Sequence, residues 1–480
     1  MKKVVIHIFI LYVVGMLVGC SVTPNLPEGE FLYTGIDKVK VQDKTGSSDE
    51  DVALTEVKAA LDYAPNGALL GSSYARSPFQ LGLWTYNALA DKPRKGLNKW
   101  LFNSFASAPI TISQVSPETR VMVATNLLQN YGYFRGNVDY QLVDQRRPQK
   151  KKIEYDVNLG QPHLFDSIRY AFSEEQDSLI HATKEEPYIR RGSQFSTLNL
   201  TNEKTRIVNS FRNNGYYYYR PDYVRYFADS TNIPYRVTLL VAPDLDMPEK
   251  ANRKFYFGTV SAYIRQNMRS EEGRMRRQNR TTNIYDDSLM ERSIKVAYQG
   301  KKMPIVPRVL FKNFKFWRRR VYDQSKVDQT LTNLHSMDIF SNIKFSFIPR
   351  DTTSLNDTLD VRLDLTMDQL LDVEANFNIT QKSNAQIGPN LGLTFSKRNA
   401  FRHGETLSVG LKGSYEWQTR TQFGAPKRID SYELGADISL SYPWIAFPWL
   451  NKRFYKYPTW TKFRLSADQL NRANYYRLMS

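Results

Sequence analysis

The chain contains a single cysteine, Cys20, among its 480 residues. An internal disulfide is therefore excluded, and so is a zinc site built from several thiolates. Histidine is also scarce and is dispersed without metal-ligand spacing: His7, His163, His181, His335 and His403. Neither a Gly-x-Ser-x-Gly motif nor a glycine-rich phosphate loop occurs. We therefore expect a protein that has no catalytic residues and uses no cofactor and no metal.

Long hydrophobic runs are missing after the N-terminus, so no later stretch predicts a membrane-spanning helix. The N-terminus has two lysines followed by an apolar stretch from 4 to 18, which is typical of a signal peptide. The stretch ends in Leu-Val-Gly-Cys, which resembles the lipobox of bacterial lipoproteins. We therefore expect residues 1–19 to be removed, Cys20 to be acylated with fatty acids such as palmitate, and residues 20–30 to form a tether. A chance cysteine behind a signal peptide is the alternative.

Acidic residues are outnumbered: Lys and Arg total 66 and Asp and Glu total 48, a formal net charge of +18. A basic chain with many aromatic residues can bind nucleic acid. Export argues against that partner, and no stretch is typical of a nucleic-acid fold. Basic segments close to anionic lipid head groups are the simpler interpretation. For any one basic run, a solvated surface is an equally good explanation.

The last hundred residues, from about Leu370, alternate apolar and polar side chains with a period of two. The first run places Val373, Ala375, Phe377 and Ile379 on one face. Four further runs begin near residues 390, 406, 432 and 459, and the start of a sixth strand is expected at 474–476. Such alternation indicates strands with one apolar and one polar surface. Each is roughly 9–11 residues long, which suits a tilted strand across a bilayer.

A soluble antiparallel sandwich would show the same alternation. Three features favour a membrane barrel instead. The polar faces hold many Gly, Ser and charged residues, as a wet lumen would, and the N-terminus directs the chain to a membrane. Aromatic residues also gather at the ends of the runs, as in an interfacial girdle: Tyr415, Trp417, Tyr442, Trp444, Phe447, Trp449 and Trp460.

Between the tether and these strands, one pattern occurs three times: a helix, a kink, a strand, a polar turn and another strand. The helices are expected near 117–128, 200–211 and 327–334. The strands that follow them are expected near 137–143 with 152–159, 222–227 with 235–241, and 342–348 with 358–365. An apolar strand precedes each copy, near 33–41, 165–170 and 255–264. Gly132, Gly215 and Asp338 lie at the kinks, where a left-handed backbone conformation suits Gly and is accessible to Asp.

The order strand, helices, strand, strand resembles the POTRA (polypeptide-transport-associated) domain, which is β-α-α-β-β. Three such units before a C-terminal barrel resemble the BamA/TamA outer-membrane insertase superfamily. With a lipoprotein signal in front, the chain is most similar to the TamL group of TamA-like lipoproteins. Residues 398–407 resemble the family's connection into its third barrel strand. The implied fold class is α+β POTRA-like repeats followed by the N-terminal strands of an antiparallel transmembrane β-barrel.

The resemblance implies five segments that follow the signal peptide and extend to the end of the chain. They are the tether, three POTRA-like units at 31–161, 162–245 and 246–367, and the start of a barrel at 368–480. The first unit contains an insertion at 64–112 with Ser- and Gly-bearing turns, and the third contains a polar insertion at 265–307. The family's barrel has many more strands than we count, so we expect the chain to be truncated within the barrel. The loop motif of the family would then lie beyond it.

The resemblance also implies a function, a location and partners. The expected function is insertion of outer-membrane proteins, with the POTRA units in the periplasm. The expected partners are unfolded outer-membrane proteins, a TamB-like periplasm-spanning protein and outer-membrane lipids. Clients would add to the second strand of each unit, and the candidate client contacts are Val138, Tyr140, Tyr223, Tyr226, Ile343 and Phe345.

The first barrel strand, with Val373, Ala375, Phe377 and Ile379, would form one side of a lateral gate. Three alternatives remain open: a secretion pore for one dedicated exoprotein, a role in TamB-linked lipid transfer, and a lipid-anchored soluble binding protein. Each candidate client contact is also a plausible core side chain.

Overall fold

The computed structural model describes most of the chain as two compact units, one formed by Met1–Ile207 with Pro221–Leu245 and the other by Val208–Arg220 with Asp246–Ser480. The described residues are 26–77, 80–90, 95–183, 185–266, 287–291, 294–300, 302–350, 357–381, 386–418, 431–447, 459–472 and 476–480. Among them, no helix is both long enough and apolar enough to cross a lipid bilayer.

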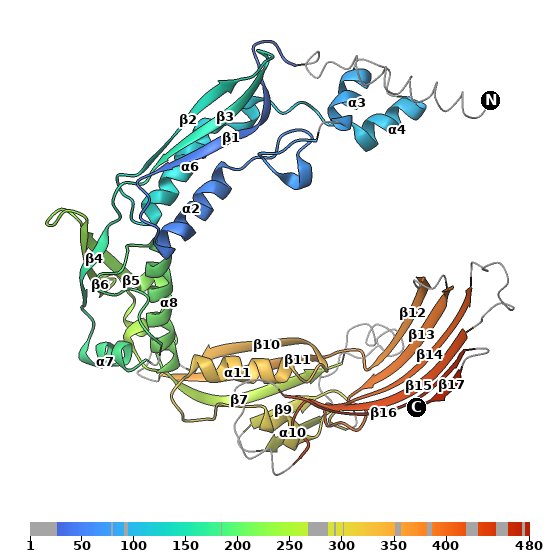
Figure 1. Ribbon diagram of the computed structural model, residues 1–480. Helices are drawn as coiled ribbons and strands as arrows, with labels where there is room; N and C mark the ends of the chain where they lie inside the picture. Colours follow the sequence, from blue (N-terminus) through green and yellow to red (C-terminus); the bar gives the residue numbers. More distant parts are fainter. Residues whose placement is uncertain are drawn as a thin grey trace, which may run out of the picture. The chain divides into compact units, whose positions relative to one another are not determined.

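The first sheet has the order β1-β3-β2 (Figure 1). Its strands are β1 (Leu32–Gln42), β2 (Asn137–Asp144) and β3 (Lys150–Asn158). β1 runs parallel to β3, and β2 runs antiparallel to it. The helices α2 (Ser48–Leu61) and α6 (Pro117–Asn130) contribute Val57, Leu61, Ala124 and Leu128 to a core that includes Tyr33, Tyr155 and Val157. The predicted β-α-α-β-β order is therefore confirmed here.

The insertion between α2 and α6 differs from the expected set of turns. It contains the short turn η1 (Leu69–Gly71) and three helices, α3 (Leu81–Leu89), α4 (Gly96–Phe105) and α5 (Ile112–Val115). α3 and α4 pack as a helical hairpin, with the rings of Tyr86 and Phe102 5.8 Å apart. The prediction missed these helices because Gly, Pro and Ser interrupt the apolar periodicity on which it relied.

The second sheet repeats the topology, with the order β4-β6-β5. Its strands are β4 (Leu164–Tyr170), β5 (Val224–Asp229) and β6 (Arg236–Pro243), and its helices are α7 (Glu174–Ala182) and α8 (Thr197–Asn213). The strands predicted near 222–227 and 235–241 are both present, and they begin two residues and one residue later than expected. Residues up to Tyr223 form the 3₁₀ turn η2 (Pro221–Tyr223), and Tyr235 has φ 58°, so it lies outside β6.

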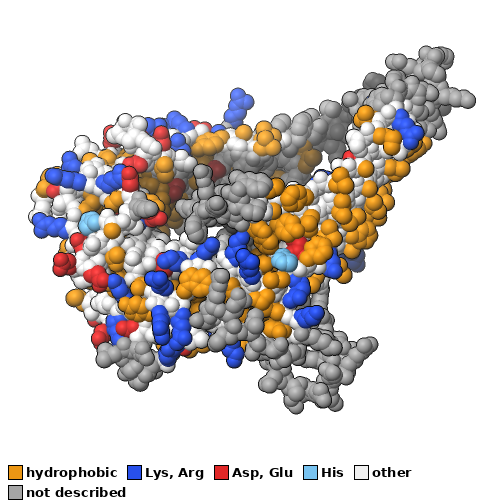
Figure 2. Space-filling model, turned by 90° about the horizontal axis from the view of Figure 1, so that it is seen from below, with side chains coloured by type: hydrophobic (Ala, Val, Ile, Leu, Met, Phe, Trp, Pro, Cys, Tyr) orange, Lys and Arg blue, Asp and Glu red, His pale blue; other side chains and the backbone are white. Residues whose placement is uncertain are grey.

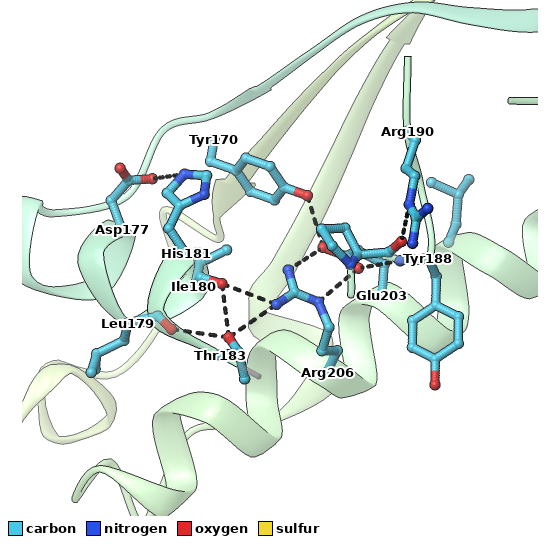
Figure 3. A network of polar contacts seen from close by, with 12 residues as sticks. Tyr170, Asp177, Leu179, Ile180, His181, Thr183, Tyr188, Arg190, Glu203 and Arg206 are labelled. Atoms are coloured by element: carbon cyan, nitrogen blue, oxygen red, sulfur yellow. Dashed lines mark hydrogen bonds and ion pairs between the residues drawn. The ribbon is translucent and has the colours of Figure 1, made fainter. Parts of the chain in front are cut away.

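A buried ion pair fixes the helices of this second sheet (Figure 3). Arg206 donates to Glu203 through Nε at 2.9 Å and Nη2 at 2.6 Å, and both residues are almost fully buried. Nη1 of Arg206 also donates to the carbonyl of Ile180 at 3.0 Å, at the end of α7. Tyr170 of β4 donates its hydroxyl to Glu203 at 2.7 Å. The pair therefore links α8 to α7 and to β4.

The third sheet contains the same arrangement with two added strands, in the order β10-β11-β7-β9-β8. Its strands are β7 (Tyr256–Arg265), β8 (Asp287–Glu291), β9 (Ile294–Tyr298), β10 (Phe340–Pro349) and β11 (Thr358–Met367). A 3₁₀ turn, η3 (Glu249–Asn252), precedes them, and the helices are α10 (Pro307–Lys312) and α11 (Gln324–His335). β7 runs parallel to β11, and β10 runs antiparallel to it.

The 265–307 insertion, which the sequence predicts to be polar, contributes strands and core residues to the third sheet in its described part. β9 pairs in parallel with β7, and β8 pairs with β9. Ile294, Val296 and Ile305 are buried in the core of the third sheet. The prediction failed because this apolar segment is short and follows a long Arg-rich stretch.

The C-terminal residues form a six-stranded antiparallel sheet in the order β12-β13-β14-β15-β16-β17. Its strands are β12 (Leu371–Gln381), β13 (Gln386–Arg398), β14 (Thr406–Gln418), β15 (Ser431–Tyr442), β16 (Thr461–Arg472) and β17 (Tyr476–Met479). All five predicted strands are present, together with a sixth. The fold class is therefore confirmed: three POTRA-like α+β repeats precede antiparallel strands that fit the start of a barrel.

The predicted kinks also have the expected backbone conformation. Gly132, Gly215 and Asp338 have φ of 83°, 109° and 52°. A Cβ at Gly132 would lie 2.8 Å from the carbonyl oxygen of Phe195, and one at Gly215 would lie 2.9 Å from Cγ1 of Val321. Both glycines are thus required by conformation and by space.

Candidate functional site: open sheet edges and a two-faced sheet

Each of the three α/β sheets leaves the same strand at an edge. The first and third strands of each repeat pair in parallel: β1 with β3, β4 with β6, and β7 with β11. The second strand, which is β2, β5 or β10, pairs antiparallel on the other side of the third strand and ends the sheet. A strand at an edge presents backbone N–H and C=O groups that another strand can pair with. The topology therefore creates three comparable edges.

The alternation of an antiparallel ladder identifies which backbone groups of β2 point outward. Just beyond the strand, the amide of Gln145 donates to the carbonyl of Lys150 at 3.3 Å. Counting in twos from there, residues 143, 141, 139 and 137 face β3, so Val138, Tyr140 and Leu142 direct their backbone groups away from β3. The amide of Val138 agrees with this assignment because it donates to Thr125 Oγ1 of α6 at 3.2 Å. The outward-facing amide of Val138 is thus bonded to α6, whereas the backbone groups of Tyr140 and Leu142 point outward along the open edge.

The same reasoning applies to β5. The amide of Asp244 donates to the carbonyl of Tyr223 at 2.8 Å, so Tyr223 faces the sheet. Val224, Tyr226 and Ala228 then face outward. The hydroxyl of Tyr226 donates to the carbonyl of Leu200 at 2.7 Å, and burial raises the pKa of this tyrosine above its ordinary value. Ala228 is exposed, so its backbone is the most accessible of the three.

On β10, the amide of Arg350 donates to the carbonyl of Thr358 at 3.0 Å. By the same alternation, the residues that face outward with their backbone groups are Ile343, Phe345 and Phe347. Their side chains pack against the core of the third sheet. At this edge too, the backbone is turned outward while the side chain is turned inward.

The six predicted client-contact residues can now be placed. Five of them lie on edge strands with outward-facing backbone, and Tyr223 does not. Their side chains are buried or half-buried, so any client contact at these positions would be made by the backbone. The exposed apolar side chains of the three edge strands, which sequence reasoning did not select, are Leu142, Phe227 and Ile348. Strand alternation would have identified Phe227 and Ile348 once the core-facing residues were known, but not Leu142, which alternates in step with Val138 and Tyr140.

The six-stranded sheet has two contrasting faces. Paired residues continue the apolar face across the strands, as in the row Val373, Phe395, Val409, Ile438 and Leu465. Figure 2 shows hydrophobic side chains gathered in a band over this sheet. The predicted gate residues lie on β12, which forms one edge of the sheet, and Val373, Phe377 and Ile379 are each more than 60% exposed. An exposed apolar face of this extent indicates a surface that contacts lipid or protein.

The opposite face carries ion pairs and small polar residues. Lys412 contacts Glu433 at 2.8 Å and Asp468 at 2.9 Å, and Arg464 contacts Asp437 at 3.1 Å. The hydroxyls of Ser396 and Ser408 lie 2.8 Å apart. At the ends of strands, aromatic side chains lie in pairs: the ring centroids of Tyr415 and Trp417 are 6.2 Å apart, and those of Tyr442 and Trp444 are 5.6 Å apart. This distribution is typical of a barrel wall with a wet interior and interfacial aromatics.

The connection between β13 and β14 docks against the third sheet. Asn399 is buried, and its Nδ2 donates to the carbonyl of Pro304 at 2.8 Å. Nη2 of Arg402 donates to the carbonyl of Met303 at 2.6 Å, and the amide of Val306 donates to the carbonyl of Arg402 at 2.8 Å. Glu405 is fully buried and accepts hydrogen bonds from the amides of Phe401 and His403. In the sequence, this segment was noted only because it resembles a connection in a known family. The resemblance does not predict these contacts with the third sheet.

Other predicted features fall partly or wholly outside the described residues. Cys20, the signal peptide and most of the tether lie there, as does Trp449. Within the described part of the chain, no group of three or more His, Cys, Asp or Glu side chains is arranged to hold a metal ion.

Comparison with known proteins gives a result only at the level of structure. No family model and no curated protein matches the chain. Among solved structures, the POTRA domains 3–5 of BamA from Haemophilus influenzae are 12% identical, with a TM-score of 0.31 and coverage of 71% of this chain and 99% of that one.

Two solved structures that extend further are also similar. BamA from Haemophilus ducreyi lacking POTRA domains 1–3 is 11% identical (TM-score 0.32), with coverage of 64% of this chain and 52% of that one. CdiB from Acinetobacter baumannii is 12% identical (TM-score 0.26), with coverage of 66% and 55%. The chain thus spans about half the length of these two structures. At this identity and TM-score, the likenesses concern the fold alone.

Proposed function

We propose that the chain is an outer-membrane lipoprotein of the BamA/TamA superfamily, of the TamL type, that assists the insertion of β-barrel proteins. The observation that carries this proposal is the repeated topology: three sheets in succession leave their second strand as an edge, before a two-faced antiparallel sheet. In this arrangement the repeats lie in the periplasm, and Cys20 and the six-stranded sheet hold the chain in the outer membrane.

Strand addition provides the mechanism. An unfolded barrel protein has unpaired strand edges, and main-chain hydrogen bonds to β2, β5 or β10 would satisfy them irrespective of sequence. β12 would then act as the gate strand on which the client begins to insert. The driving force is the hydrogen bonding and burial of client strands in the membrane, so no nucleotide is needed. A TamB-like protein is the partner proposed for the periplasmic side.

Proline scanning of an edge tests this mechanism. Ala228→Pro removes an outward-facing N–H from β5 without removing a ladder hydrogen bond, and proline is tolerated at such edge positions. Ala228→Ser is the matched control because it keeps the N–H. With a photo-crosslinker at the exposed Phe227, we expect several outer-membrane proteins to crosslink in the Ala228→Ser background and markedly fewer in the Ala228→Pro background.

A second crosslinker position provides an internal reference. Leu240 on the central strand β6 pairs directly with Phe227, so it reports the same surface away from the edge. Equal client crosslinking by the Ala228→Pro and Ala228→Ser proteins would contradict strand addition at β5. Crosslinks to one exoprotein alone would instead support a dedicated secretion pore.

Heat-dependent gel mobility tests the barrel and the lipid anchor separately. The full-length protein from outer membranes is run unheated and boiled, with and without Cys20→Ala. We expect a mobility shift that survives the substitution, because a closed barrel resists detergent without its lipid. Loss of the shift, with release of the Cys20→Ala protein into the soluble fraction, would leave a lipoprotein that only binds through its repeats.

A further inference from the structure

The helical hairpin α3–α4 of the first repeat presents an apolar patch. Leu81 begins α3, and Phe105 ends α4; they lie close together because the amide of Ser107 donates to the carbonyl of Gly82 at 2.9 Å. The ring of Trp100 meets that of Phe105 edge-to-face at 5.8 Å. Leu81, Trp100 and Phe105 are 64%, 57% and 53% exposed. We call these three residues the hairpin patch.

The hairpin patch is not needed to hold the two helices together. The inward faces are joined by Tyr86 and Phe102, and Leu83 is almost fully buried. Each of the three patch residues points instead into solvent. A tryptophan and a phenylalanine that remain this exposed side by side mark a contact surface more strongly than scattered apolar residues do.

The charge around the patch indicates its partner. Lys95 and Lys99 are exposed at the start of α4. Across residues 64–112 there are five basic residues and one acidic residue. An aromatic and aliphatic patch on a helical hairpin that also carries exposed lysines is suited to the interface of a bilayer with anionic head groups, where the rings enter the acyl boundary and the ammonium groups meet the phosphates.

We propose that the hairpin patch docks the first repeat onto an anionic phospholipid surface. The contact goes beyond client handling and does not depend on it, since it uses none of the edge strands. It would keep the start of the periplasmic repeats at a membrane surface, independently of the lipid at Cys20.

Vesicle flotation tests this docking in the full chain. Cys20→Ala is used as the background so that the lipid anchor does not contribute, and amphipol covers the six-stranded sheet. The protein is mixed with preformed phosphatidylcholine vesicles in which roughly one lipid in three is phosphatidylglycerol, or with phosphatidylcholine alone. We expect flotation with the anionic vesicles, weakened by added salt, and little flotation with the neutral ones.

Two variants and one control separate the contributions. Leu81→Ser/Trp100→Ser/Phe105→Ser is expected to lower the apparent affinity about tenfold or more. Lys95→Gln/Lys99→Gln, which changes only exposed charges, is expected to remove the preference for anionic vesicles. Met122→Ser on α6 is the control because Met122 is 59% exposed but lies outside the hairpin; it is expected to float like the parent protein.

Three outcomes would overturn the proposal. The first is flotation by the triple-serine variant equal to that of its parent. The second is an unchanged preference for anionic lipid in the lysine variant. The third is self-association in sedimentation that the triple variant abolishes, without any vesicle binding by the parent, which would make the hairpin patch a contact between copies of the chain.

Discussion

Asn399 and Pro304 connect the six-stranded sheet to the third sheet through a buried hydrogen bond, from Nδ2 to the carbonyl oxygen at 2.8 Å. The same asparagine accepts a hydrogen bond from the amide of Gly404 through Oδ1 at 3.0 Å. Its φ of 54° is in the left-handed region, which asparagine tolerates better than most residues. One side chain thus closes the β13–β14 turn and attaches it to the segment before α10.

Asn399→Ala is expected to loosen this joint while both sheets remain folded. The substitution leaves the carbonyl of Pro304 and the amide of Gly404 without their side-chain partner, at a cost of about 1–3 kcal/mol for each group that stays buried. Faster amide hydrogen exchange is expected at 302–306 and 399–405. Asn376→Ala on the exposed strand β12 is the control and should leave both segments unchanged. Unchanged exchange in Asn399→Ala would show that the Arg402 contacts alone hold the joint.

Arg206→Met is expected to destabilise the second sheet strongly. It leaves Glu203 buried without its cationic partner, a type of change that costs about 3–5 kcal/mol. The double variant Glu203→Gln/Arg206→Met should recover much of this loss, because a neutral Gln can still accept from Tyr170 and no buried charge remains. Amide exchange protection of α7 and the first turns of α8 provides the measurement.

The pKa of Arg206 supports the expected order of these variants. Burial alone would lower the pKa of Arg206, but its hydrogen bonds to Glu203 and the charge of that carboxylate outweigh burial and keep the pKa above its ordinary value. Equal losses of protection in the single and double variants would contradict the idea that an uncompensated charge is what destabilises the sheet.

The sequence predicted regular elements well where burial is one-sided. Runs such as Leu407, Val409 and Leu411 alternate without interruption because each strand of the six-stranded sheet has one apolar face, and a period of two is unambiguous there. The kinks at Gly132 and Gly215 were also predictable, since few other residues adopt their conformation. The three edge strands were expected only from the resemblance to POTRA domains, because the alternation of side chains does not show which strand ends a sheet.

Other parts of the site depend on contacts between residues far apart in the chain. Asn399 and Pro304 are 95 residues apart in the chain, and no local pattern connects them. Thr125 caps the amide of Val138 through a tertiary hydrogen bond, and another tertiary hydrogen bond involves the turn residue Tyr223. Only the structure shows these bonds. The hairpin α3–α4 was missed because Gly, Pro and Ser interrupt the apolar periodicity around two short helices, and their exposed apolar residues obscure the amphipathic pattern further.

Glu50 is expected to make the start of α2 sensitive to acid. Its carboxylate accepts hydrogen bonds from the amide of Thr45 at 2.6 Å and the amide of Gly46 at 3.2 Å, as well as from the Thr45 hydroxyl. Burial alone would raise the pKa of Glu50, but these hydrogen bonds outweigh it, so the pKa lies below its ordinary value of 4.5. The stability they provide is fully present above that value and is lost as the pH falls through the lower folded pKa.

Glu50→Gln tests this acid sensitivity. We expect the amide protection of α2 to fall in the parent protein as the pH is lowered below about 4.5, after correction for intrinsic exchange rates. The variant should be less protected at neutral pH, by roughly 1–3 kcal/mol, and should change less with pH. Glu118→Gln on α6 is the control, since no backbone amide is bonded to its carboxylate in the described contacts. Identical pH profiles for Glu50→Gln and the parent would assign the acid response to other groups.

Arginine substitutions on the two faces of β14 are expected to differ in their effect on membrane insertion. Leu411 lies near the middle of the strand on the apolar face, and Ser414 lies on the polar face three residues away. A cation on the lipid-facing side near the bilayer centre costs about 2–4 kcal/mol, whereas one in a wet lumen costs far less. Leu411→Arg should therefore reduce the heat-modifiable protein recovered from outer membranes, and Ser414→Arg should leave it near the parent level.

The contrast between these two variants decides which face of the sheet contacts lipid. A soluble sandwich would also be harmed by Leu411→Arg, but its loss would appear as unfolded or aggregated protein regardless of detergent or lipid. For a barrel wall, insertion of Leu411→Arg should recover in thinner bilayers, because the arginine then reaches the head groups more easily. Equal insertion of both variants in every bilayer would mean that the apolar face packs against protein and not against lipid.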